Sequence, residues 1–384
     1  MSFQKNNIMR PIAMVDLKSQ YQKIKPEIDS AIQEVIDNTA FINGAAVKIF
    51  TENMAKYLGV KHVIPTGNGT DSLQIALMAL DLQPGDEVIT SPFTFVATAE
   101  VIALLKLKPV FVDVDPFTFN INVNEIEAKI TNRTKAIIPV HIFGQAPLME
   151  SIMELATHYN LAVIEDTAQA LGSEYYFDDN TTRKLGTIGK MGCTSFFPSK
   201  NLGGYGDGGA IFTNNDTLAE KLRSLVNHGM TVRYYHDYIG VNSRLDSIQA
   251  AILNVKLKHL DEYNEKRRDA AAFYTKAFSN NVHITPPTVS PKSKHIYHQY
   301  TLKMNNVDRD KLQAHLKEKG IPSAIYYPVP LHLQKAYIHY GYKRGDFPVT
   351  ETLSNIVLSL PMHTELDKAQ LTYITESVLE FVND

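Results

Sequence analysis

Tryptophan is absent from the 384 residues, and cysteine occurs once, at position 193. A lone thiol excludes an internal disulfide and a cysteine-based zinc site, and we expect Cys193 to serve packing rather than nucleophilic chemistry. The chain also lacks an excess of either charge, since 38 Lys and Arg stand against 41 Asp and Glu. Without a concentrated basic patch, neither nucleic acid nor a membrane surface is expected as a partner.

Long apolar runs are missing as well. None near the N-terminus is long enough for a signal peptide or a membrane span, which predicts a cytoplasmic protein. The 13 histidines are not paired with a second His, Asp or Glu at a convincing ligand spacing, so we predict no metal site. What the chain does have is length for two or three domains with well-buried cores.

Strand-like and helix-like segments alternate through the first half of the chain. Residues 26–58 have helical periodicity, and strands are predicted at 62–65, 87–90, 109–114, 136–140 and 162–165. The helices predicted between these strands lie at 72–82, 95–105, 124–129 and 149–158. Repeated βα units predict an α/β fold with a mostly parallel sheet and helices on both faces.

The pattern changes after about residue 215. Long helices are predicted at 218–228 and over 247–278, followed by strands at 297–304 and 323–327 around a helix at 311–319. We predict a large domain over 1–258 and a smaller C-terminal α/β domain over 259–384. Residues 176–190 are interpreted as a hairpin with a solvent-exposed tip.

Two segments contain candidate catalytic groups. In VIEDTAQALG at 163–172 an apolar strand ends in carboxylates, so Asp166 is expected at a strand's C-terminal edge, where open α/β sheets bind ligands. Taken alone, Asp166 fits a helix cap about equally well. In TSFFPSKNLGGYGDGG at 194–209, Lys200 precedes a glycine-rich turn. A half-buried lysine has a depressed pKa and can act as a nucleophile, although most lysines beside such loops lie on the surface.

A third segment, GNGTDS at 67–72, lies between a strand and a helix. Free N–H groups and the helix dipole suit a phosphate there, but the segment matches neither the P-loop nor the dinucleotide fingerprint. By itself it would be read as an ordinary helix start. In the order phosphate turn, aspartate, lysine, the three segments suit a cofactor with a phosphate, a basic ring nitrogen and an aldehyde, as in pyridoxal 5′-phosphate.

The chain resembles the DegT/DnrJ/EryC1/StrS aminotransferases over nearly its whole length, in the runs GNGTDSL, GDEVITSPFTFVATAE, EDTAQALG, TSFFPSKNLGGYGDGGAIFTN and GVNSRLDSIQAAIL. This resemblance implies fold type I of the pyridoxal-phosphate enzymes, similar to aspartate aminotransferase. It also implies L-glutamate as amino donor, a nucleotide-linked keto sugar as acceptor, and a homodimer with composite active sites. The branch it looks most like aminates C3 of UDP-2-acetamido-2-deoxy-3-oxo-glucuronate for surface polysaccharide, including lipopolysaccharide.

The resemblance also implies a role for each matching residue. The reacting lysine, which forms the Schiff base and moves the proton, would be Lys200. Residues that hold the cofactor would be Asp166 at the pyridine nitrogen, Gln169 at the 3-hydroxyl, Phe95 on the ring face, Gly69, Thr70 and Ser195 at the phosphate, and Asn242 at the phosphate of the neighbouring subunit. Candidate substrate contacts are Arg244, Tyr326 and His332.

Other interpretations stay open at this point. Phe95 fits a plain core aromatic, and Asn242 and Arg244 fit helix capping. Close relatives often have a histidine, linked to a uronate carboxylate, where Tyr326 stands, so a neutral UDP- or dTDP-linked keto-deoxysugar aminated at C3 or C4 is an alternative substrate. A sugar dehydratase of this fold typically replaces the lysine by histidine, and a regulatory member would lose Lys200 or Asp166.

Overall fold

A seven-stranded sheet organises the N-terminal two-thirds of the computed structural model, which describes residues 10–383. The strand order across the sheet is β1 (His62–Thr66), β9 (Gly209–Thr213), β8 (Met191–Ser195), β5 (Ala162–Asp166), β4 (Thr134–Ile137), β2 (Glu87–Thr90) and β3 (Lys108–Phe111). Of these described strands, only β9 runs antiparallel to its neighbours. The predicted α/β fold with a mostly parallel sheet is confirmed.

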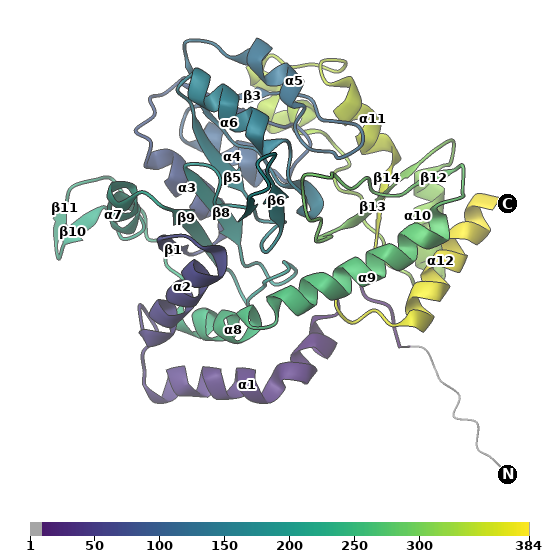
Figure 1. Cartoon of the computed structure of the whole chain (residues 1–384), viewed down its shortest axis with the longest axis horizontal. Helices are drawn as coiled ribbons and strands as arrows, with labels where there is room; N and C mark the ends of the chain where they lie inside the picture. Colours follow the sequence, from purple (N-terminus) through teal and green to yellow (C-terminus); the bar gives the residue numbers. More distant parts are fainter. Residues whose placement is uncertain (1–9, 384) are drawn as a thin grey trace.

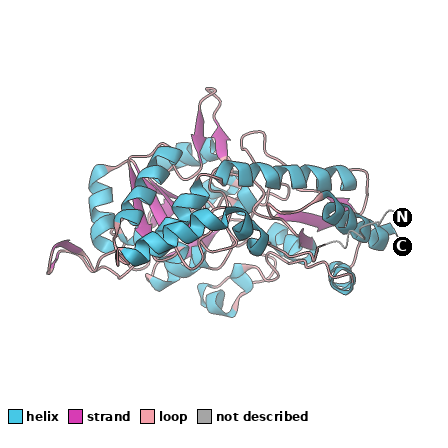
Figure 2. Ribbon diagram, turned by 90° about the horizontal axis from the view of Figure 1, so that it is seen from below, coloured by secondary structure: helices cyan, strands magenta, loops and turns pink. Residues whose placement is uncertain are grey.

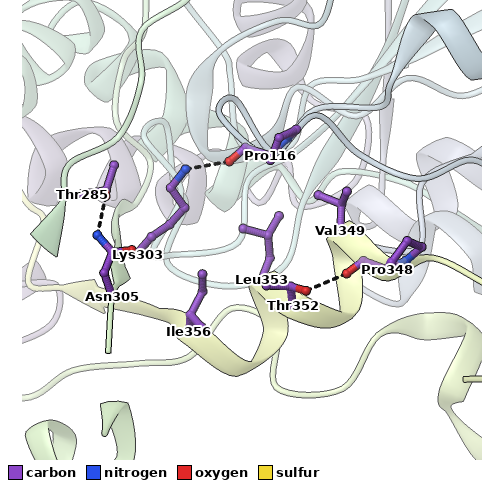
Figure 3. Close-up of a pocket in the computed structure, with 9 residues that line it drawn as sticks. All are labelled: Pro116, Thr285, Lys303, Asn305, Pro348, Val349, Thr352, Leu353 and Ile356. Carbon is purple, nitrogen blue, oxygen red and sulfur yellow. Dashed lines mark hydrogen bonds between the residues drawn. The ribbon is translucent and has the colours of Figure 1, made fainter. Parts of the chain in front are cut away.

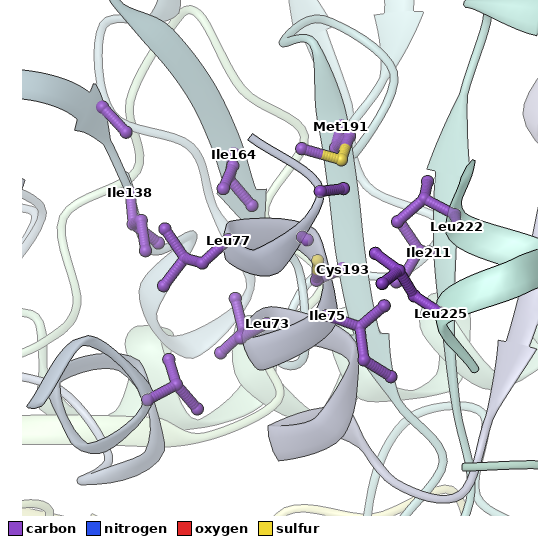
Figure 4. Close-up of a cluster of buried hydrophobic side chains, with 14 of the residues drawn as sticks. Leu73, Ile75, Leu77, Ile138, Ile164, Met191, Cys193, Ile211, Leu222 and Leu225 are labelled. Atoms are coloured by element: carbon purple, nitrogen blue, oxygen red, sulfur yellow. The ribbon is translucent and has the colours of Figure 1, made fainter. Parts of the chain in front are cut away.

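Helices cover both faces of this sheet (Figure 1). One face packs against α3 (Gly69–Met78), α4 (Ala97–Leu104) and α7 (Asp216–Leu225), and the other against α2 (Ala45–Leu58), α5 (Val123–Ile126), α6 (Met149–His158) and α8 (Ser247–Leu257). Alternating strand residues divide between the faces, since Ile164 packs on the first side and Val163 on the second. Cys193 lies in the core beneath α3 (Figure 4). Its side chain is 1% exposed, which agrees with the predicted packing role.

The N-terminal helical region differs from the prediction. It forms two helices, α1 (Leu17–Asp37) and α2, instead of one continuous segment over 26–58. The side chain of Asp16 caps α1, and Pro26 lies inside the helix rather than at its start. Because proline favours the first turn of a helix, a start at residue 26 was a reasonable expectation, but the helix begins earlier, at Leu17.

A second, smaller sheet lies in the C-terminal part of the chain, apart from the first along the long axis (Figure 2). It consists of β12 (Ile284–Thr285), β13 (Tyr300–Met304) and β14 (Val357–Leu360), all antiparallel. The helices α9 (Leu260–Phe278), α10 (Arg309–Glu318) and α12 (Lys368–Asn383) share a buried core with it. The helix predicted over 247–278 is therefore broken, at residues 258–259.

The strand predicted at 323–327 was wrong. Only Ala324 forms an isolated bridge, with Ser359, and β14 takes the place next to β13. Pro322 and Pro328 flank the segment, and proline cannot donate to a strand ladder. The missing strand leaves this stretch free to approach the large sheet.

The boundary between 1–258 and 259–384 stays a prediction, and residues 1–9 lie outside the described part. The short helices η3 (Leu331–Leu333) and η4 (Lys335–Tyr340), together with α11 (Pro348–Ile356), pack against Phe93 and Phe111 of the large part. Two further 3-10 turns are η1 (Glu127–Lys129) and η2 (Ile142–Gly144).

Two small hairpins lie outside the main sheets. The first joins β6 (Glu174–Tyr176) to β7 (Thr182–Lys184), and its tip over 178–183 is exposed, which agrees with the predicted hairpin. The second joins β10 (Met230–Val232) to β11 (Tyr235–His236) and projects beyond α7 in Figure 1. Among residues 10–383, no helix is both long and apolar enough to span a membrane.

Candidate functional site

Asp166 is the last residue of β5 and is 6% exposed. Its Oδ2 atom accepts a hydrogen bond from Thr98 Oγ1 at 2.9 Å, and its Oδ1 atom accepts one from the Ala168 amide at 3.1 Å. Turns follow over 168–172 and lead into β6, so the helix-cap alternative for Asp166 was wrong. The carboxylate is held at the C-terminal edge of a parallel strand, the usual position of a ligand site in such sheets.

Lys200 lies in the turn after β8, with its side chain half-buried. Burial lowers the pKa of its amine to about 8, and the nearby negative charge of Asp166 opposes that shift. In the described part of the chain, no hydrogen bond or ion pair occupies the Lys200 amine. The structure thus brings the two central residues of the prediction together and leaves the amine available for chemistry.

The first turn of α3 and the end of β8 form a small cradle. The side chain of Asn68 accepts the Asp71 amide at 2.8 Å, which leaves the amides of Gly69 and Thr70 at the open helix end. A Cβ on Gly69 would lie 2.5 Å from Cβ of Ser195, so only glycine fits against that strand. The two free amides, together with the hydroxyls of Thr70 and Ser195, lie around a helix N-terminus and suit a phosphate.

Gln169 is buried, 7% exposed, and both ends of its amide are bonded. Its Oε1 atom accepts the Phe143 amide at 2.8 Å, while its Nε2 atom donates to the Tyr327 hydroxyl at 3.0 Å. Burial is the main cause of a raised Tyr327 pKa, so this phenol stays protonated. Gln169 is therefore fixed beside Asp166, with one N–H of Nε2 still free to donate.

Phe95 is 56% exposed, so its interpretation as a core aromatic was wrong. It precedes α4, and its carbonyl accepts the amide of Thr98 at 3.3 Å. Because Thr98 contacts Asp166, the open face of Phe95 belongs to the same region. The exposed ring is available to stack on a flat ligand.

Asn242 is exposed, and the Arg244 Nη1 atom donates to Asn227 Oδ1 at 3.1 Å. The N-cap of α8 is Asp246, so the capping alternative for Asn242 and Arg244 was wrong. Ser243, between them, accepts the amide of Gly67 at 2.8 Å and thereby fixes this segment to the phosphate turn. Within residues 10–383, neither Asn242 nor Arg244 forms a hydrogen bond with Lys200 of the same chain.

The C-terminal candidates differ in accessibility. Tyr326 is half-buried and lies beside Tyr327, with ring centroids 5.9 Å apart, which leaves it at the edge of the site. His332 is fully buried, its Nε2 atom lies 3.0 Å from Glu351 Oε1, and its ring packs on Phe347. Since no part of this ring is open, the structure does not support His332 as a substrate contact.

Two residues of the site were missed by sequence reasoning. Thr98 is one of two polar residues in the mostly apolar helix α4, the other being Glu100, which is a weak signal. Tyr327 was hidden within a predicted strand. A pocket of about 380 Å³ between β13 and α11 (Figure 3) lies elsewhere, since none of the predicted residues line it. There Lys303 donates to the Pro116 carbonyl at 2.7 Å, so its amine is already engaged.

Comparison with known proteins identifies the family of the chain. Residues 22–379 match the DegT/DnrJ/EryC1/StrS aminotransferase family. The chain is 48% identical to a protein of Geobacillus stearothermophilus named pleiotropic regulatory protein, over 96% of this chain and 98% of the relative. It is 45% identical to UDP-2-acetamido-2-deoxy-3-oxo-D-glucuronate aminotransferase of Pseudomonas aeruginosa, over 94% and 98% of the two chains.

A solved structure is similar over nearly the same length. NtdA from Bacillus subtilis, determined with bound cofactor PMP, superposes with a TM-score of 0.89 at 30% identity, covering 99% of this chain and 87% of the other. Family match, sequence identity and fold agree over almost the whole chain. The chain therefore belongs to the DegT/DnrJ/EryC1/StrS aminotransferase family.

Proposed function

We propose that this protein uses pyridoxal 5′-phosphate to move an amino group from L-glutamate to a keto group of a nucleotide-linked sugar. The observation that carries the proposal is the neighbourhood of Lys200 and Asp166, in which a free amine of lowered pKa lies close to a buried carboxylate. A non-catalytic regulatory member would not need this arrangement, although one relative is named as a regulator. A dehydratase with histidine at this position is disfavoured by Lys200 itself.

The donor set fits the cofactor at each of its polar groups. Asp166 suits a protonated ring nitrogen, the free N–H of Gln169 suits a ring hydroxyl, and the tight contact of Gly69 with Ser195 forms the phosphate cradle. Phe95 offers a stacking face, and the chain has no tryptophan that could take this role. When bound, the cofactor supplies an aldehyde for amines and a ring that accepts an electron pair.

The residues of the chain then have separate tasks. The Lys200 amine acts as nucleophile and moves the proton to and from the reacting carbon. With a pKa near 8, about a tenth of such amines are neutral at pH 7, against fewer than about one in a thousand for an ordinary lysine. Asp166 keeps the proton on the ring nitrogen, and Thr98 orients Asp166.

For the substrate we propose amination at C3 of UDP-2-acetamido-2-deoxy-3-oxo-glucuronate, in the formation of a surface polysaccharide. The named activity of the Pseudomonas relative supports this choice. With His332 enclosed, Arg244 and Tyr326 are the remaining candidates to recognise the uronate carboxylate. The alternative is a neutral keto-deoxysugar, because Tyr326 has no charge to pair with a carboxylate.

We further propose a homodimer in which Asn242 reaches the phosphate of the other subunit. Two observations support this arrangement: the side chain of Asn242 is exposed, and among the described residues it forms no hydrogen bond with Lys200 of its own chain. A cytoplasmic location remains a prediction from the sequence.

A reverse assay tests the substrate assignment directly. Purified enzyme is given 2-oxoglutarate and a panel of UDP- and dTDP-linked amino sugars, and loss of each sugar is followed by mass spectrometry. Turnover of the 3-amino uronate is expected. Reaction of neutral 4-amino sugars without turnover of the uronate would contradict the proposed substrate, and no reaction together with no bound cofactor would contradict the function.

A further inference from the structure

A buried histidine–glutamate pair lies directly behind Asp166. The His141 Nε2 and Glu165 Oε2 atoms are 2.9 Å apart, and both side chains are 0% exposed. Neither residue belongs to the cofactor site described above. Glu165 precedes Asp166 on β5, and successive strand residues point to opposite faces of a sheet, so its carboxylate points away from that of Asp166.

The carboxylate of Glu165 also accepts hydrogen bonds from three backbone amides. Its Oε1 atom accepts the amides of Ile188 and Gly189, each at 2.7 Å, and its Oε2 atom accepts the amide of Gly186 at 2.9 Å in addition to His141. Three backbone N–H groups donate to this carboxylate and favour it as a pure acceptor, so we assign the proton of the fourth bond to His141 Nε2.

The second ring nitrogen of His141, Nδ1, indicates why a histidine occupies this position. Its Nδ1 atom is buried and has no hydrogen-bond partner among the described residues. An unsatisfied buried polar atom costs stability, and an apolar side chain would fill the same space without that cost. The bond from Nε2 to Glu165 is therefore the feature that distinguishes histidine from leucine at this position.

The pair joins three strands that meet at the site. The backbone of Asp166 accepts the amide of His141 at 3.0 Å and donates to the Pro139 carbonyl at 2.9 Å, just beyond β4. On its other side Asp166 is paired with Cys193 of β8. The loop over 186–189, bonded to Glu165, leads into β8, which ends at Ser195 shortly before Lys200.

We propose that His141 and Glu165 are positioning residues, which hold β4, β5 and β8 in register so that Asp166 keeps its place relative to Ser195 and Lys200. They touch neither cofactor nor substrate. This inference rests on the proposed function, because the three groups it aligns are those that would hold the pyridine nitrogen, the phosphate and the aldehyde.

The chain offers a control in a second histidine–glutamate pair, in which the buried His332 lies 3.0 Å from Glu351, whose side chain is 12% exposed. Glu351 also accepts a backbone amide, from Gly345 at 2.8 Å. The variants are Glu165→Gln, His141→Leu and His141→Gln, whose amide nitrogen can replace Nε2, with Glu351→Gln as control. Each purified protein is stripped of cofactor, titrated with pyridoxal phosphate by absorbance, and scanned for thermal unfolding without cofactor.

Glu165→Gln and His141→Leu should weaken cofactor binding about tenfold or more and shift the pH midpoint of the cofactor's visible absorbance, while His141→Gln should restore both. Glu351→Gln should lower the unfolding temperature alone. Should Glu165→Gln fail to fold, the two His141 variants decide the question. Wild-type binding and pH midpoint in both His141→Leu and Glu165→Gln, with only lower unfolding temperatures, would overturn the inference. Failure of the wild-type chain to bind pyridoxal phosphate would instead overturn the proposed function.

Discussion

The Thr98 hydroxyl donates a hydrogen bond to Oδ2 of Asp166 across 2.9 Å, with both residues nearly closed to solvent. This bond connects α4, which follows the exposed Phe95, to the strand end that would hold the ring nitrogen. This one hydrogen bond thereby fixes the position of the Asp166 carboxylate relative to the segment that contains the Phe95 ring. The relationship was not visible in the sequence, because the two residues are 68 positions apart.

Replacing Thr98 by Val should weaken the site without changing its shape. Valine keeps the volume but removes the donor to a buried carboxylate, a loss of about 1–3 kcal/mol. We expect kcat/KM to fall about tenfold or more, with Thr98→Ser close to wild type. Steady-state kinetics with saturating pyridoxal phosphate measures this, and equal values for Val and Ser would show that the hydroxyl has no role.

The parts of the site that follow local rules could be predicted from sequence. Asp166 ends a short apolar strand and Lys200 precedes a glycine-rich turn, and both patterns are readable along the chain. Thr98 and Tyr327 could not be found this way, because their roles come from contacts between distant segments. The strand wrongly predicted at 323–327 is a different case, because Pro322 and Pro328 on either side of it were a local signal against a strand.

Lys200→Ala should abolish both cofactor attachment and transamination, because no other described amine has been placed at this site. The control is Lys190→Ala, an exposed lysine just before β8, which should behave as wild type. Absorbance spectra and mass spectrometry after borohydride reduction measure attachment. Retention of a reduced cofactor adduct on the Lys200→Ala chain would show that another residue reacts.

The lowered pKa of Lys200 has a consequence for the stability of the cofactor-free protein. Between the folded pKa, about 8, and the unfolded value of 10.5, the unfolded chain binds more protons, so stability rises with pH across this window. Below pH 8 the folded state holds an unfavourable buried charge, which Lys200→Met removes. The variant should be more stable than wild type by about 1–3 kcal/mol at pH 7, and the difference should shrink towards pH 10.5. Urea unfolding at both pH values tests this, and a constant difference would exclude a titrating Lys200.

Gly69→Ala should impair the phosphate cradle through a steric clash. The added Cβ would lie 2.5 Å from Cβ of Ser195, so the helix end must move away from β8. We expect pyridoxal-phosphate affinity to fall at least about tenfold. In a Ser195→Gly background the 2.5 Å contact is removed and the nearest remaining atom is the Cα of residue 195 at 3.0 Å, so the same substitution should cost less affinity. An equal loss in both backgrounds would refute the steric explanation.

Complementation between two defective chains tests whether Asn242 acts across the subunit interface. Lys200→Ala and Asn242→Ala are each expected to be inactive or nearly so as homodimers. In a heterodimer of the two, one site combines Lys200 of one subunit with Asn242 of the other and is intact, while the second site carries both defects.

Random pairing in co-expressed chains makes half of the dimers mixed, each with one working site, so about a quarter of wild-type activity should return. If Asn242 served the site of its own chain, every site would contain one defect and no activity would return. Separately tagged chains, purified through both tags, raise the expected value to about half and remove the dependence on random pairing.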